Sequence, residues 1–221
     1  MTFHIITLFP NAFDSYLGES ILKRAIEDKK IKVKFYNPRD FSDNKFKHID
    51  RPPYGGGPGM VIQALPVIKA IEKAKSNCSL IRANRRIVEK VKIIWLSPGG
   101  KQFETGTAKK LVKFKHLIII CGRYEGIDAR VKKAFKVEEI SIGPYVLTGG
   151  ELPAMAIIDS VSRQVEGVLG NFDSREEERV SSSDVYTRPE VLEYKGKKLR
   201  VPKVLLSGHR AKIEEWKKKG V

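Results

Sequence analysis

The fold is decided by two stretches, IIICGRYEGIDARV at Ile118–Val131 and EEISIGPYVLTGGELPAMAIIDSVSRQ at Glu138–Gln164. In the first, an apolar run opens into a turn that contains two glycines. In the second, a short apolar segment at Ile140–Ile142 opens into a loop that ends on Gly149 and Gly150. Open α/β sheets bind ligands beyond the carboxyl ends of their strands, and glycine allows close backbone approach. The two loops therefore predict a ligand site, although tight turns alone would use the same glycines.

On both sides of these stretches, the sequence predicts that strands and helices alternate along the chain. Apolar or alternating runs predict strands at 3–9, 31–36, 91–97, 116–121 and 140–142. Helices are predicted at 11–29 with Asn11 as the cap, from Pro66 to about Ser76, at 103–114 and at 150–168. The segment 37–60 is rich in Pro and Gly and is predicted to be a loop. This order predicts an α/β fold with a parallel sheet and helices on both faces.

The composition changes after Gly170. The segment Asn171–Ser183 is polar, locally acidic and poor in apolar residues, as expected of a linker. The remainder is basic and ends in a predicted helix that carries Trp216. We therefore predict a catalytic domain at 1–168, a linker at 169–184 and a small, mostly helical domain at 185–221.

The net charge is +16 and the isoelectric point is about 9.8, which favours a polyanionic partner. Charge alone leaves nucleic acid, an anionic membrane and a merely solvated basic surface open. The N-terminus, MTFHIITLF, resembles a strand rather than a signal peptide. No apolar run reaches membrane-spanning length, so we expect a cytoplasmic protein without membrane contact.

The two cysteines, Cys78 and Cys121, stand in no CxxC pair and have no histidine beside them in the chain. Structural zinc usually needs four Cys or His ligands. The sequence therefore predicts no metal site, and Cys121 is predicted to be a small buried residue.

Five further blocks occur along the chain: LFPNAF (Leu8–Phe13), YGGGPGM (Tyr54–Met60), LSPGG (Leu96–Gly100), YTRPEVLE (Tyr186–Glu193) and VPKVLLSGH (Val201–His209). With the opening stretches, and in this order, they resemble the bacterial tRNA (guanine-N1)-methyltransferases of the SPOUT superfamily. The resemblance implies a C-terminal trefoil knot in the sheet domain, S-adenosylmethionine as cofactor, tRNA as partner and a homodimer. It also implies methylation at N1 of the guanosine immediately 3′ of the anticodon, position 37.

By the same resemblance, three loops form the cofactor pocket. The residues implied are Leu96, Ser97, Pro98, Gly122, Tyr124, Glu125, Ser141, Ile142, Gly143, Pro144, Tyr145, Val146, Leu147, Gly149, Gly150 and Pro153.

Methylation of guanine N1 requires a general base, because N1 carries a proton at neutral pH. The family places an aspartate in the linker, and the matching position here is Glu178, in a linker shorter than usual. Glu176 or Glu177 could serve instead, or the acidic run could be a solvated surface without a base. Arg163 matches the family arginine that serves the reacting guanine. Its alternative role is an i, i+4 ion pair with Asp159.

The resemblance also implies substrate contacts at Asp50, Tyr54 and Arg188. The YGGGPGM loop lacks the Lys-Ser/Thr pair of a phosphate-binding loop. Arg51 stands where the family often has a second acidic residue. Family members are magnesium-assisted, but the sequence shows no dedicated cluster of carboxylate ligands. Whether this protein uses Mg²⁺ is therefore left open.

Two other functions are also compatible with the sequence. One is a SPOUT methyltransferase acting at another RNA position, against which the linker and the YTRPEVLE block argue. The other is a cofactor- and RNA-binding protein without catalysis, which is suggested by Glu178, Arg51 and a C-terminal stretch shorter than the family's.

Overall fold

The computed structural model describes residues 1–82, 85–88, 90–169 and 184–219. The chain divides into two compact units, Met1–Gly170 and Asn171–Val221. The first unit is built on a five-stranded sheet in the order β2-β1-β8-β7-β9, with every neighbouring pair parallel. Its strands are β1 (Thr2–Ile6), β2 (Lys32–Tyr36), β7 (Val91–Gln102), β8 (His116–Ile120) and β9 (Glu138–Ser141).

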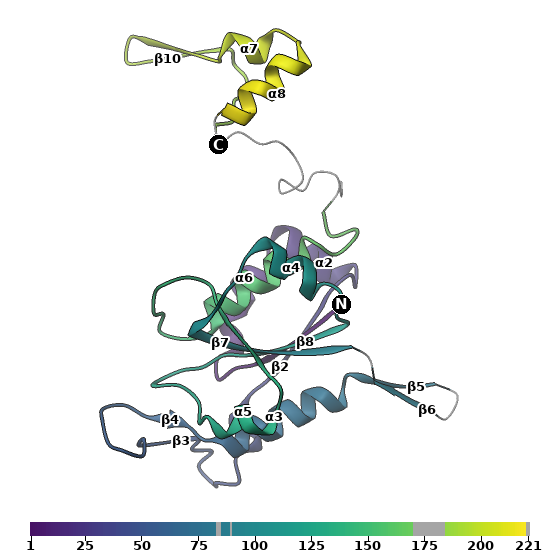
Figure 1. The fold of residues 1–221 in the computed structure, drawn as a ribbon, viewed down its shortest axis with the longest axis vertical. Coiled ribbons are helices and arrows are strands. Elements are labelled where there is room, and N and C mark those ends of the chain that lie inside the picture. Colours follow the sequence, from purple (N-terminus) through teal and green to yellow (C-terminus); the bar gives the residue numbers. More distant parts are fainter. Residues whose placement is uncertain (83–84, 89, 170–183, 220–221) are drawn as a thin grey trace. The chain divides into compact units, whose positions relative to one another are not determined.

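Helices cover both faces of this sheet, as predicted (Figure 1). One face packs against α2 (Ser20–Glu27), α4 (Thr105–Leu111) and α6 (Glu151–Ser162). The other packs against α3 (Ala64–Ser76) and α5 (Arg130–Ala134). Every residue of the central strand β8 is buried, which explains its unbroken apolar sequence.

Several predicted elements differ from the structure. The helix expected at 11–29 is divided into a 3-10 turn, η1 (Pro10–Phe13), then α1 (Asp14–Leu17) and α2. Asn11 lies inside η1 and makes no cap, so that prediction was wrong. The chain leaves α1 at Gly18 and passes through an extended Glu19, which ends the helix. The helix expected at 150–168 ends at Ser162.

The segment predicted to be a loop at 37–60 contains short ordered elements. They are the 3-10 turn η2 (Pro38–Phe41) and the strand β3 (Asp50–Arg51), which pairs with β4 (Val61–Ile62). The helix α5 and the hairpin of β5 (Ser79–Arg82) and β6 (Arg85–Val88) were not predicted.

The second unit contains an antiparallel hairpin of β10 (Val191–Tyr194) and β11 (Lys197–Arg200), then α7 (Lys203–Leu206) and α8 (Arg210–Lys219). We predicted a mostly helical domain here, and the prediction did not include this hairpin. Its turn at Lys195-Gly196 has positive φ at both residues, as a type I′ hairpin turn requires. Across the described parts of both units, no helix has the length and apolar character needed to cross a bilayer.

Candidate active site

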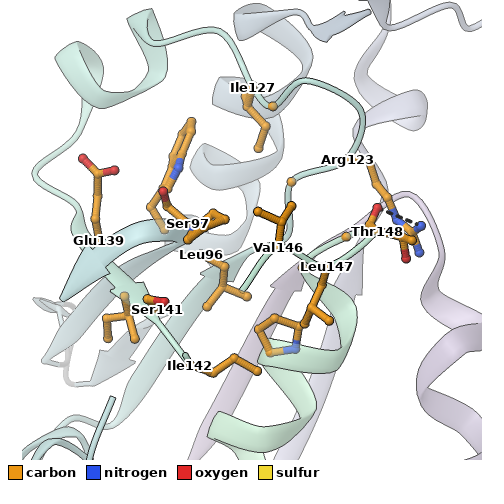
Figure 2. Close-up of a pocket in the computed structure, with 18 of the residues that line it drawn as sticks. Leu96, Ser97, Arg123, Ile127, Glu139, Ser141, Ile142, Val146, Leu147 and Thr148 are labelled. Carbon is orange, nitrogen blue, oxygen red and sulfur yellow. Dashed lines mark hydrogen bonds between the residues drawn. The ribbon is translucent and has the colours of Figure 1, made fainter. Parts of the chain in front are cut away.

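A pocket of about 410 Å³ lies where three loops leave the sheet. The first loop follows Leu96 within β7, the second follows β8, and the third follows β9 and leads into α6. Figure 2 shows Glu139 and Ser141 on one side of this pocket and Arg123 with Thr148 on the other. Because β8, β7 and β9 are parallel neighbours, their carboxyl ends bring these loops to one edge of the sheet.

The structure gathers the residues predicted for the cofactor around this pocket. All of them line it except Pro144, which is exposed on the third loop. Other lining residues were missed by the prediction: Trp95, Arg123, Gly126, Ile127, Lys132, Glu139, Ile140 and Thr148. Six of them lie inside the two opening stretches, and Trp95 and Lys132 each lie one residue outside a quoted block. Lys132 and Glu139 form a 3.0 Å ion pair at the pocket.

Two glycines are needed here for close backbone approach. A side chain at Gly150 would place its Cβ 2.6 Å from the Cα atom of Cys121, and one at Gly100 would lie 2.6 Å from the amide nitrogen of Ile140. Neither glycine has a positive φ. Tight turns therefore do not explain them. They allow the first loop to cross β9 and the third loop to lie against the second, and the Gly150 amide donates to the Gly122 carbonyl at 2.9 Å.

A buried carboxylate braces the second and third loops. Glu151 is 3% exposed and accepts a 2.8 Å hydrogen bond from the Thr7 hydroxyl. Its other oxygen lies 3.0 Å from Nε of Arg123, but the two atoms are not aligned for a hydrogen bond, so the contact is electrostatic. Arg123 also donates to the Thr148 carbonyl at 3.2 Å and stacks over the Phe9 ring at 4.6 Å. The pocket wall is thus tied to β1.

The pocket combines apolar surface with a few polar groups. Leu96, Ile142 and Val146 supply apolar contacts, while Glu125 and Glu139 supply carboxylates. The Ser141 hydroxyl donates to the Gly143 carbonyl at 2.9 Å and shapes the start of the third loop. Burial raises the pKa of the Cys121 thiol well above its ordinary value, so this cysteine is a protonated core residue, not a nucleophile.

The YGGGPGM loop lies beside the second pocket loop. The Glu125 amide donates to the Met60 carbonyl at 3.0 Å, and Gly59 packs against the Glu125 side chain. Asp50 lies nearby in β3, where it pairs with Ile62. Tyr54 is fully exposed and does not line the pocket.

The predicted catalytic residues do not line the pocket. Arg163 follows the last residue of α6, ten residues after Pro153, which corresponds to about 15 Å of helix. The Asp159 carboxylate, its proposed alternative partner, accepts a hydrogen bond from the Tyr16 hydroxyl. Glu178 and its competitors lie outside the described residues. Arg188 belongs to the second unit, in an exposed segment before β10.

The chain is similar to known tRNA methyltransferases along its whole length. The family model described as "tRNA (Guanine-1)-methyltransferase TrmD" matches residues 1–221. The chain is 44% identical to the tRNA (guanine-N(1)-)-methyltransferase of Clostridioides difficile, over 99% of this chain and 91% of that protein. It is 46% and 44% identical to the proteins of the same name from Caldanaerobacter subterraneus and Bacillus subtilis, in each case over 99% of this chain and 86% of the relative. The chain therefore belongs to the tRNA (guanine-1)-methyltransferase family, within the SPOUT superfamily.

Proposed function

We propose that this protein transfers a methyl group from S-adenosylmethionine to N1 of the guanosine immediately 3′ of the tRNA anticodon. One observation carries the proposal: in a chain of this family, the three loops expected to hold the cofactor converge on one pocket of about 410 Å³. That volume is within the usual range for a small-molecule site.

The pocket residues fit the proposed cofactor. Leu96, Ile142 and Val146 offer apolar surface for an adenine ring, and the backbone of the glycine loops offers donors and acceptors for ribose and amino-acid groups. Glu125 places a carboxylate where a ligand with an ammonium and a sulfonium would be stabilised, whereas the Glu139 carboxylate is paired with Lys132. When bound, the cofactor supplies an activated methyl group on a positively charged sulfur.

The protein would then contribute a base and a cation. Glu178 would accept the proton from guanine N1, with Glu176 or Glu177 as the alternative linker carboxylates. Arg163 would stabilise the negative charge that develops on O6 as that proton leaves. Both groups act by position, because methyl transfer depends on holding N1 close to the methyl group and in line with it.

A homodimer would bring these groups together. Within one chain, about 15 Å of helix separates Pro153 in the pocket from Arg163. A second copy could present its own Arg163 to the pocket, which supports the dimer that the family resemblance implies. The trefoil knot is part of the same proposal. It is supported by the third loop, which returns across the second at the Arg123–Gly149 bridge. The charge of +16 supports tRNA as partner, and a tRNA substrate supports the cytoplasm as location.

The proposed reaction is tested by transfer of labelled methyl from S-adenosylmethionine to an unmodified tRNA transcript. One transcript carries guanosine 3′ of the anticodon, and the control carries adenosine there. We expect labelling of the first and none of the second, assayed with and without Mg²⁺. Equal labelling of both would indicate another RNA position. Cofactor binding without labelling of either would indicate a binding protein without catalysis.

A further inference from the structure

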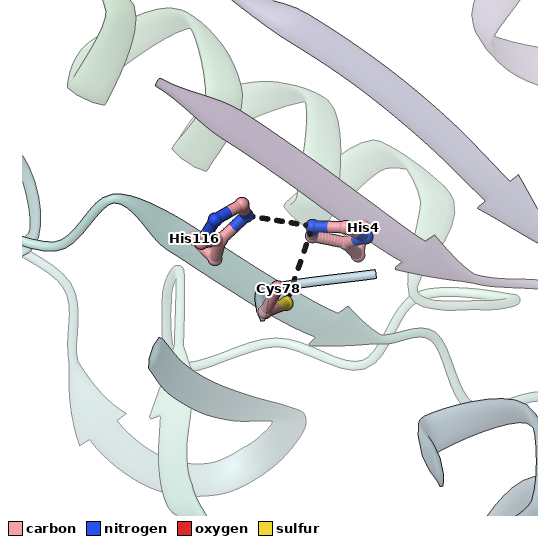
Figure 3. A group of neighbouring side chains, drawn as sticks. All are labelled: His4, Cys78 and His116. Carbon is pink, nitrogen blue, oxygen red and sulfur yellow. Dashed lines mark hydrogen bonds between the residues drawn. The ribbon is translucent and has the colours of Figure 1, made fainter. Parts of the chain in front are cut away.

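A second cluster of reactive side chains lies away from the pocket. His4 in β1, His116 at the start of β8 and Cys78 just after α3 are all buried, and their ligand atoms lie within 4.8 Å of one another. Figure 3 shows the two rings and the thiol turned toward a common point. The three residues are far apart in the chain, so only the folded sheet and α3 bring them together.

The distances suit a metal ion. Nε2 of His4 is 3.0 Å from Nδ1 of His116 and 3.5 Å from Sγ of Cys78. In a tetrahedral zinc site, bond lengths of about 2.1 Å to nitrogen and about 2.3 Å to sulfur put nitrogen and sulfur ligands about 3.3 to 3.6 Å apart. The two measured distances are within a few tenths of an ångström of these values, and the ligand atoms of Cys78 and His116 lie within 4.8 Å of each other.

The surroundings supply the outer hydrogen bond that a ligating histidine needs. Nδ1 of His4 lies 2.9 Å from the Tyr36 hydroxyl, which also accepts from the Asn77 amide at 3.0 Å. A hydroxyl oxygen has two acceptor lone pairs, so it can accept from Asn77 and from a protonated Nδ1 at the same time. That tautomer leaves Nε2 of His4 free to bind a metal, and such outer partners orient metal-ligating imidazoles.

We propose that His4, Cys78 and His116 supply three of the ligands of a thiophilic divalent cation of the Zn²⁺ type, which ties β1 and β8 to the segment that follows α3. Thiolate and imidazole are the ligands that this class of ion prefers. Binding breaks the S–H bond of Cys78 and forms a metal–sulfur bond, releasing one proton to solvent. The Ala74 carbonyl, which now accepts from the thiol at 3.1 Å, loses that donor. The ion leaves the reaction pocket unchanged and stabilises the fold.

The test uses full-length protein that has been stripped with a chelator, unfolded, and refolded with or without ZnCl₂. Refolding matters because the small pocket in front of His116 is lined by Lys29, Lys32 and Lys115, which oppose the entry of a free cation. We expect one zinc ion per chain after desalting and a melting temperature raised by several degrees. Substituting Co²⁺ should give a thiolate-to-cobalt charge-transfer band.

The chain provides matched controls, since it has two cysteines and four histidines. Bound zinc and the cobalt band should both be lost in Cys78→Ala and in His116→Gln. Both should be kept in the two control variants, Cys121→Ala and His209→Gln, which replace residues outside the cluster. If Cys78→Ala fails to fold, the cobalt spectrum of the wild-type protein still decides. Refolded wild-type protein without bound zinc or a thiolate band would overturn the proposal, as would zinc retained without Cys78.

Discussion

At Gly150 the backbone of the third pocket loop lies against the backbone at the start of the second. Gly150→Ala would place a methyl group 2.6 Å from the Cα atom of Cys121, so one loop must move away. We expect a loss of about 1–3 kcal/mol in the free energy of unfolding. We also expect about tenfold weaker binding of S-adenosylmethionine, equal to about 1.4 kcal/mol. Urea denaturation and calorimetric titration measure the two effects.

Gly106 is the matched control for this substitution. It lies in α4 with open space where a Cβ would be, and its φ is not positive. Gly106→Ala should therefore leave cofactor binding unchanged and stabilise the helix by about 0.5–1 kcal/mol. Equal cofactor affinity in both variants would contradict the close-approach explanation of Gly150.

The buried environment of Glu151 allows a second prediction about the free energy of unfolding. Glu151→Gln keeps an oxygen for the Thr7 hydroxyl but removes the charge that faces Arg123. Because Glu151 is buried, we expect the free energy of unfolding to fall by about 2 kcal/mol. Asp43→Asn, which breaks the exposed 2.6 Å pair with Lys69, should cost less than about 1 kcal/mol. Similar losses for the two variants would show that the buried pair does not brace the loops.

At the scale of elements, α6 joins the cofactor pocket to Arg163, and α1 is attached to it through Tyr16 and Asp159. Asp159 lies one helical turn before Arg163, so a carboxylate released from Tyr16 can pair more strongly with that guanidinium. In Tyr16→Phe we expect kcat for methyl transfer to fall several-fold while cofactor affinity stays unchanged. Stability should change by less than about 1 kcal/mol, because Tyr16 is largely exposed. An unchanged kcat would show that this pair has no part in positioning Arg163.

At the scale of the whole molecule, the net charge of +16 predicts salt-dependent tRNA binding. The logarithm of the association constant should fall linearly with the logarithm of the salt concentration. In the second unit, Lys197 and Lys198 are exposed on β11, and Lys198 lies 3.5 Å from the Glu193 carboxylate. Replacing both with alanine should reduce the slope by about one to two if each contacts a phosphate. Lys69→Ala, which removes a lysine paired with Asp43, is the control. An unchanged slope in the double variant would assign tRNA binding to other basic residues.

The sequence by itself determined the elements whose causes are local. The buried run of β8 and the helix that begins near Pro66 depend on apolar pattern and on proline's fixed φ, both readable within a few residues. The order of these elements was enough for a parallel sheet with loops gathered at one edge. The residues of the three pocket loops were expected from the family resemblance, and they lie together because each loop directly follows its strand.

Only the tertiary structure decided what depends on contacts between distant segments. Short elements such as α5 and the β5–β6 hairpin have too few residues for a clear period. Lys132 in α5 and Glu139 in β9 both line the pocket and form a 3.0 Å ion pair, a contact between two elements that neither local sequence records. The cluster of His4, Cys78 and His116 also depends on distant segments. His4 is 74 positions from Cys78 and 112 positions from His116 in the chain. The packing of β1, β8 and α3 brings these side chains into contact. Hydrophobic burial holds the elements together, and the polar side chains that they carry are thereby placed side by side.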